Sequence, residues 1–127
     1  MTIKVPRRKV QIEICYPGAC ISVNHYRGRS AAGGEYVRRE ARAWQEELMW
    51  TIKPLGIERW RIPLEVTCDG VFLDKNHQPD LSNLSKCSLD AIEEVTGIND
   101  KNMRWRDGQV SYGEKPLLLI TIKEGLI

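Results

Sequence analysis

Four stretches of the chain have the pattern of β-strands. They are residues 9–15, 62–73, 103–112 and 116–124. The first, KVQIEIC, alternates apolar and polar side chains, which is the period-two pattern of a strand with one buried face. Gly70, inside the second, marks a possible β-bulge. The turn Gly113-Glu114-Lys115 predicts that the last two strands are joined as a hairpin.

Two other stretches have the spacing of amphipathic helices. Residues 35–53 place apolar side chains at three- and four-residue steps and charged ones on the other side, and Pro54 should end this helix. A second helix is predicted from residue 80 or 81 to about residue 95, with Gly97 as its terminator. The side chains predicted to face the core are Val37, Ala41, Trp44, Leu48 and Ile52 in the first helix and Leu81, Leu84, Ser88, Ala91, Ile92 and Val95 in the second.

The segment between the first strand and the first helix lacks a regular period. Residues 21–36, ISVNHYRGRSAAGGEY, are rich in Gly, Ser and Asn, and we predict a long loop of the kind that is often functional. The element order is therefore β-α-β-α-β-β, without a repeat, a low-complexity stretch or a linker. This order predicts a single α+β domain over residues 1–127, with a mixed sheet and two main helices.

Composition narrows the class of protein. The 127 residues are enough for one core, and no apolar run approaches the roughly 20 residues that span a bilayer. The N-terminal stretch lacks the apolar centre and cleavage site of a signal peptide, so we expect a cytoplasmic protein. The four cysteines have no paired C-x-x-C spacing, which argues against zinc. We expect reduced thiols at core or strand positions.

The charge of the chain leaves two interpretations open. A net charge of +2 is too small to identify a nucleic-acid-binding protein. The arginines nevertheless occur in close groups, and guanidinium groups suit phosphate oxygens. A solvated, salt-bridged surface explains the same groups, and charge alone favours that interpretation. The groups are Arg7 and Arg8; Arg27 and Arg29; Arg38, Arg39 and Arg42; Arg59 and Arg61; Arg104 and Arg106.

Polar residues crowd the beginning of the second predicted helix. Asp80 follows a proline and precedes an amphipathic run, so its carboxylate could cap free backbone N–H groups, which is worth about 1 kcal/mol. Lys86 could pair with Asp90 at the i+4 position. Capping alone does not explain why Asn83 and Lys86 follow on the exposed side, or why Asp100 lies just past the helix.

The segment PDLSNLSKCSLDAIEEVTGINDKNM resembles the defining segment of the RusA family of Holliday-junction resolvases. The family's segment runs Asp-x-Asp-Asn-Leu-x-Lys, then Asp-Ala, then a turn with an acidic pair and a strand. The residues in register here are Asp80, Asn83, Leu84, Lys86, Asp90, Ala91 and Asp100. The stretches SVNHYRGR and EYVRREARAW also resemble the family's loop after the first strand and the start of its first helix, so the resemblance spans nearly the whole chain.

The resemblance implies a small homodimer that uses Mg²⁺ to nick paired strands at four-way DNA junctions. It implies catalytic roles for Asp80, Asp100 and Lys86, with the two aspartates as metal ligands. Two positions depart from the family pattern. The family's second aspartate falls at Ser82, and the first acid of its acidic pair falls at Asn99.

Magnesium binding does not require both of the acids that are replaced here. Magnesium can be held by one or two carboxylates while water and phosphate fill its other positions. Ser82 is a poorer ligand than an aspartate, so we expect weaker metal binding. Possible auxiliary groups are Ser82, Asn83, His77 and Asp74, with Asp69 on the preceding strand as a further candidate. Asp90 is interpreted as structural, because about 15 Å of helix separates it from Asp80.

Three hypotheses follow for the function. The first is a Mg²⁺-dependent endonuclease for four-way junctions, with Arg27, Arg29, Arg38 and Arg42 as DNA contacts. The second is a branched-DNA-binding protein on the same scaffold with weak or lost catalysis. The third is a small α+β domain whose acids only cap helices. Ser82 is the residue that separates the first two hypotheses.

Overall fold

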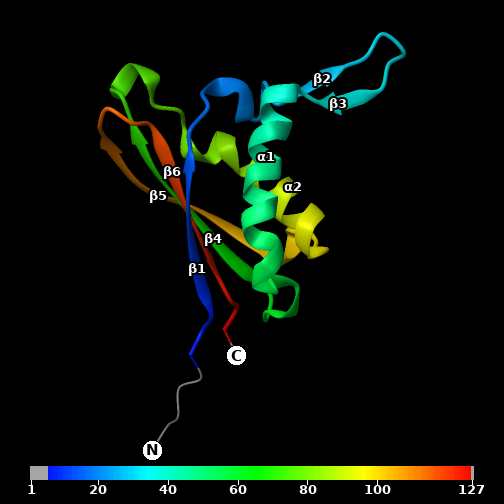
Figure 1. Ribbon diagram of the computed structural model, residues 1–127, viewed down its shortest axis with the longest axis vertical. Coiled ribbons are helices and arrows are strands. Elements are labelled where there is room, and N and C mark those ends of the chain that lie inside the picture. The colour runs from blue at the N-terminus through cyan, green and yellow to red at the C-terminus, as the bar shows by residue number, and fades with distance from the viewer. Residues whose placement is uncertain (1–5, 127) are drawn as a thin grey trace, which may run out of the picture.

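The computed structural model describes residues 6–126 and shows one α+β domain with a mixed sheet, which confirms the predicted fold class and element order (Figure 1). The strands are β1 (Lys9–Cys15), β2 (Arg27–Arg29), β3 (Glu35–Val37), β4 (Leu64–Phe72), β5 (Met103–Tyr112) and β6 (Leu117–Lys123). The two α-helices are α1 (Arg39–Ile52) and α2 (Ser85–Thr96), and short 3-10 helices join several elements. Within residues 6–126, no helix is long and apolar enough to cross a membrane.

The main sheet has the strand order β1-β6-β4-β5. β6 is antiparallel to both of its neighbours, whereas β4 and β5 run parallel. The predicted hairpin between β5 and β6 is therefore wrong, because β4 lies between them. The burial of the strands gives the reason. Alternate side chains of β6 are buried and suit the centre of the sheet, whereas β5 is mostly exposed after Met103 and suits an edge.

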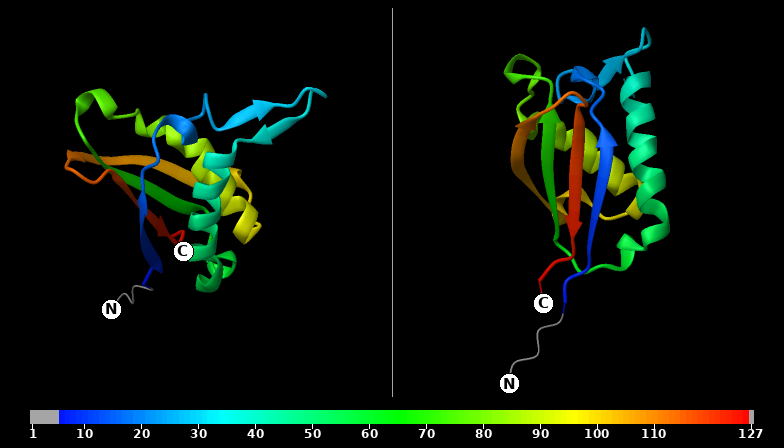
Figure 2. Two further views of the ribbon diagram at one scale, coloured as in Figure 1. Left: turned by 45° about the horizontal axis from the view of Figure 1, so that its top comes forward. Right: turned by 60° about the vertical axis from the view of Figure 1, so that its left-hand side comes forward.

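Both α-helices pack against one face of this sheet, as Figure 2 shows from two further directions. The α1 stripe is buried as predicted at Ala41, Trp44, Leu48 and Ile52. The inward side chains of β4 and β6 pack against the buried side chains of α1 and α2. Burying one Leu or Ile side chain in this core stabilises the fold by about 1.5–3 kcal/mol. Cys68 and Cys87 are also buried here, as core-filling thiols.

The predicted loop over residues 21–36 is wrong in part, because its second half forms a hairpin. β2 and β3 pair in the register Arg27↔Val37 and Arg29↔Glu35. Gly33 adopts a positive φ of 87° at the turn, a conformation that glycine accepts without strain. The first α-helix consequently begins at Arg39 rather than at residue 35. The hairpin extends beyond the end of α1, away from the sheet (Figure 1).

The second predicted helix has two parts. Residues Leu81–Leu84 form a 3-10 helix, and α2 continues from Ser85. Gly97 ends α2 in the left-handed conformation, with φ of 75°, and its N–H donates to the Glu93 carbonyl. The predicted terminator is therefore confirmed. This segment is the connection between the parallel strands β4 and β5.

The possible bulge near Gly70 is also present, but its extra residue lies on β5. Between Cys68 and Gly70, β4 advances by two residues while β5 advances by three. The Asp69 carboxylate accepts the Gln109 N–H at 2.6 Å in this irregular stretch. A Cβ atom on Gly108 would collide with that carboxylate, so glycine is required there. Asp69 therefore satisfies the backbone of the bulge.

Candidate active site and nucleic-acid interface

Asp80 caps the 3-10 helix that precedes α2. Its Oδ1 accepts the Ser82 N–H at 3.1 Å and the Ser82 hydroxyl at 2.9 Å. The predicted cap is thus present, and Asp80 remains exposed to solvent. Ser82, which occupies the place of the family's second aspartate, uses its hydroxyl on Asp80. Capping does not prevent the free Oδ2 atom from binding another group.

A surface hollow of about 510 Å³ adjoins Asp80. Asp107 of β5 lines the same hollow, and its Oδ1 accepts the Trp105 indole N–H at 2.8 Å. The sequence interpretation did not single out Asp107, because nothing in the linear pattern shows that the middle of β5 lies beside Asp80. Nearby, the Asn83 carbonyl accepts the Val23 N–H at 2.7 Å and ties this turn to the loop after β1.

Lys86 lies between two carboxylates. Its Nζ is 3.1 Å from Asp90 Oδ1 and 3.5 Å from Asp100 Oδ2. The hydrogen bond to Asp90 is the main cause that raises the pKa of Lys86, so the side chain is a stable cation. Glu93 Oε1 accepts the Asp100 N–H at 2.7 Å and fixes the turn that carries Asp100. The structure therefore brings two of the three predicted catalytic residues together.

Asp90 has more partners than its i+4 lysine. Its Oδ2 accepts the Tyr26 hydroxyl at 2.7 Å and an Arg27 N–H at 2.9 Å, and its side chain is 19% exposed. Burial, followed by the hydrogen bond to Asp90, raises the pKa of Tyr26 above its usual range. A sequence search could not find these two contacts, since more than 60 residues separate the partners.

Asp80 lies in the turn before α2 and Asp100 in the turn after it. The Asp100 N–H is bonded to Glu93 near the end of α2, whereas the Asp100 carboxylate meets Lys86, which lies near the beginning of that helix. In residues 6–126, no three His, Cys, Asp or Glu side chains are grouped closely enough to hold a metal ion. The donor chemistry suits Mg²⁺, which prefers carboxylate oxygens and retains several waters. The single chain supplies these donors from two turns, one before α2 and one after it.

The two auxiliary candidates in the preceding turn form a pair. His77 Nδ1 lies 2.7 Å from Asp74 Oδ1, and the His77 N–H donates to the same oxygen at 3.0 Å. The interaction with His77 lowers the pKa of Asp74, and both side chains are exposed. Asp74 therefore orients the imidazole ring three residues before Asp80.

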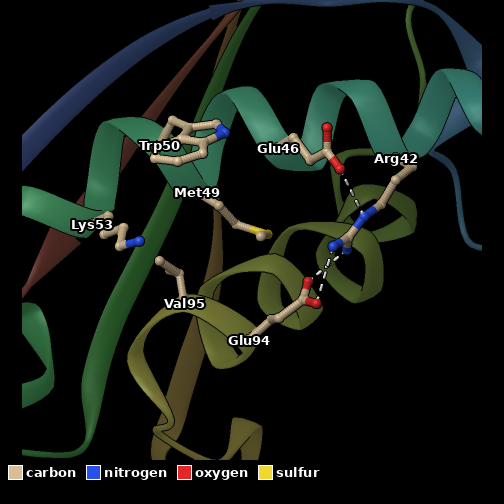
Figure 3. A pocket seen from close by; sticks show the side chains of 7 residues that line it. All are labelled: Arg42, Glu46, Met49, Trp50, Lys53, Glu94 and Val95. Atoms are coloured by element: carbon tan, nitrogen blue, oxygen red, sulfur yellow. Dashed lines mark hydrogen bonds and ion pairs between the residues drawn. The ribbon is translucent and has the colours of Figure 1, made fainter.

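The four arginines proposed as DNA contacts fall into two classes. Arg27 is paired with Asp90 and Glu35, and Arg42 is paired with Glu46 and Glu94. Figure 3 shows the Arg42 guanidinium held between these two acids, which come from α1 and α2. Arg29 and Arg38 are exposed and make no ion pair within residues 6–126. The salt-bridged interpretation therefore holds for two of the four, while the other two remain available to a ligand.

Comparison with known proteins gives one informative match. The sequence model of the endodeoxyribonuclease RusA family matches residues 17–123, which include the whole segment from Asp80 to Asp100. A search of curated protein sequences finds no significant match. Among solved structures, hydrogenase maturation protein HypE aligns with a TM-score of 0.43 and 9% identity, covering 100% of this chain and 34% of HypE, so the chain spans about a third of that protein's length. The match over most of the sequence confirms the resemblance found in its motifs, and the chain belongs to the endodeoxyribonuclease RusA family.

Proposed function

We propose that the protein is a Mg²⁺-dependent, structure-specific endonuclease that nicks four-way (Holliday) DNA junctions during recombination or repair. The family is one of endodeoxyribonucleases that resolve such junctions. The observation that carries the proposal within the fold is the contact between Lys86 and Asp100, at 3.5 Å, which joins two motif residues that are 14 positions apart. A cytoplasmic location is part of the proposal and rests on the sequence argument.

Asp80 and Asp100 would hold the metal ion in this proposal. When bound, Mg²⁺ supplies neutralisation of phosphate charge and an activated water. Lys86 would place its ammonium near the scissile phosphate, where it balances negative charge that develops as the bond breaks. Asp74 would keep the His77 ring in one orientation beside this region. Ser82 supplies a neutral hydroxyl, which supports the expectation of a weaker metal site.

A homodimer is part of the same proposal. Asp80 precedes α2 and Asp100 follows it, and the described part of one chain groups no three His, Cys, Asp or Glu side chains around a metal ion. A two-fold dimer repeats both places on the second copy and can bring Asp80 of one copy to Asp100 of the other. Such an arrangement also yields two equivalent sites, as two symmetric nicks require. Sedimentation that shows only monomer, with and without junction DNA, would overturn it.

The hairpin β2–β3 and the beginning of α1 would contact the DNA backbone. Arg29 and Arg38 are exposed there without carboxylate partners in the described part of the chain. Guanidinium groups donate to phosphate oxygens in a fork that matches their geometry. Arg42 would join them after exchanging a carboxylate for a phosphate. Arg27 would do so by releasing Glu35, at 3.5 Å, while it stays bonded to Asp90, at 2.9 Å.

The second candidate function is binding of branched DNA with weak or absent cleavage. It is favoured by Ser82, whose hydroxyl bonds to Asp80 where the family has an acid. Nicking of a synthetic four-way junction, measured with and without Mg²⁺ beside a linear duplex, distinguishes the two. Mg²⁺-dependent nicking of the junction supports the endonuclease. Tight junction binding without nicking supports the binding protein, and absence of both would contradict both proposals.

A further inference from the structure

We propose that Asp90 is a positioning residue that fixes Lys86 of the candidate site and Arg27 of the DNA-contacting hairpin at the same time. This inference rests on the proposed function and deepens it. Asp90 is not a proposed metal ligand or a DNA contact. It would act through its two neighbours, by keeping the hairpin and the candidate site in a fixed spatial relation.

The two carboxylate oxygens of Asp90 serve different parts of the molecule. Oδ1 faces Lys86 on the same helix, at 3.1 Å. Oδ2 accepts two hydrogen bonds from the loop and hairpin, one from the Tyr26 hydroxyl at 2.7 Å and one from Arg27 at 2.9 Å. Both oxygens are thus engaged, so rotation of the carboxylate would break contacts at both ends.

The cluster of Asp90 with Lys86, Tyr26 and Arg27 is more buried than an ordinary surface ion pair. The Asp90 side chain is 19% exposed, and Tyr26 is 2% exposed. Exposed ion pairs contribute little because water competes for both partners and their side chains lose freedom. A carboxylate that is mostly shielded and accepts three donors, two of them cationic, is held much more firmly.

Lys86 needs such an anchor. Its flexible chain is 46% exposed, and its other carboxylate partner is Asp100 at the longer distance of 3.5 Å. If Asp100 binds a metal cation, as proposed, it becomes a poor partner for an ammonium group. Within residues 6–126, Asp90 would then be the remaining carboxylate that holds Lys86 in place.

Arg27 links Asp90 to the hairpin β2–β3. It is the first residue of β2, its guanidinium lies 5.2 Å from the centre of the Tyr26 ring, and it also pairs with Glu35 of β3. The Tyr26 carbonyl accepts the Arg38 N–H at 2.8 Å, which ties the far side of the hairpin to the same point. The base of the hairpin is therefore fastened to α2 through Asp90.

Single-turnover cleavage of a four-way junction tests the positioning role. Asp90→Asn keeps the shape of the side chain but removes its charge, and the cleavage rate should fall by about 10- to 100-fold, the range typical for loss of a hydrogen-bonding partner that orients groups at a metal site. Junction affinity should stay the same or increase, because a negative charge is removed near the DNA. Asp90→Glu keeps the charge but displaces the carboxylate by one methylene, and it should also slow cleavage, by less. Glu65→Gln, which breaks the ion pair with Arg7 elsewhere on the molecule, should cleave like the parent.

A double-mutant cycle shows whether Asp90 acts through Lys86. In a Lys86→Ala background, Asp90→Asn should cause little further loss of rate, because the residue to be positioned is already absent. If Asp90→Asn and Asp90→Glu both cleave like the parent, the proposal is overturned. It is equally overturned if Asp90→Asn causes its full loss without Lys86, since the effect would then be general.

Hydrogen exchange provides a readout that does not depend on activity. Asp90→Asn should speed amide exchange across residues 26–38, whereas Glu65→Gln should not. Unchanged exchange in the Asp90 variant would contradict the inference even in an active enzyme. If the parent protein cleaves no junction at all, the proposed function fails, and the exchange measurement alone decides whether Asp90 fastens the hairpin.

Discussion

The Ser82 hydroxyl donates a hydrogen bond to Asp80 Oδ1 across 2.9 Å, at a position where the family motif carries an acid. The serine thereby supports the cap instead of adding a second negative charge. A carboxylate at position 82 would stand two residues from Asp80 on the same exposed turn. We expect the pairing of these two residues to limit how strongly the proposed site attracts a cation.

Ser82→Asp should therefore strengthen metal binding. A second carboxylate adds charge and two ligand oxygens near Asp80, both of which Mg²⁺ favours. We expect a lower Mg²⁺ concentration for half-maximal junction nicking, or faster nicking at low Mg²⁺. Ser82→Asn, which has a similar size but no charge, is the matched control. An unchanged Mg²⁺ dependence in Ser82→Asp would show that position 82 does not limit the site.

Asp80→Asn and Asp80→Ala should separate the capping role from the metal role. Asparagine caps helices about as well as aspartate, whereas alanine loses about 1 kcal/mol. The unfolding temperature should thus be nearly unchanged in Asp80→Asn and lower in Asp80→Ala. Both variants should lose nicking while they still bind the junction. Full nicking by Asp80→Asn would reduce Asp80 to a helix cap.

The arginine classes predict unequal effects on DNA binding. Replacing Arg29 or Arg38 with alanine should weaken junction affinity and reduce the slope of log affinity against log salt by about 1 for each phosphate that is no longer bound. Arg42→Ala should have a smaller effect, because Arg42 must first leave Glu46 and Glu94. A salt titration of each variant measures both quantities. Equal binding by all variants and the parent would mean that these arginines are only surface charges.

Glu124 should make the stability of the fold depend on acid pH. This side chain is 1% exposed, and Arg8 and Arg61 donate hydrogen bonds to it that lower its pKa to about 2. A carboxyl whose pKa is lower in the folded state stabilises the fold above its unfolded pKa, near 4.3, and this contribution is lost as the pH falls toward 2. The unfolding temperature of the parent should thus fall as the pH is lowered from about 4.5 to 2. Glu124→Gln should be less stable at pH 7 and should show a smaller loss over that range.

The sequence predicted local elements well and long-range pairings poorly. Periodicity located β5 at residues 103–112 and the glycine end of α2, because both depend on neighbouring residues. The place of β6 beside β1 and β4 depends instead on how the whole sheet buries its most apolar strand. The hairpin at residues 27–37 was missed because its short strands carry charged side chains in place of an alternating pattern. The Lys86–Asp90 pair at i+4 could be foreseen, whereas the contacts of Asp90 with Tyr26 and Arg27, and the place of Asp107 beside Asp80, arise only through folding.

Asp80 and Asp100 are proposed to act together at an active site formed between two copies of the chain. Asp80→Asn and Asp100→Asn should each bind four-way junctions without nicking them. A mixture of the two variants, refolded together, should recover Mg²⁺-dependent nicking, because a mixed dimer contains one site in which both aspartates are intact. The measurement is the nicking rate of the mixture beside that of each variant alone. Nicking only by the mixture supports a shared site, whereas an inactive mixture, or full activity of either variant alone, would contradict it.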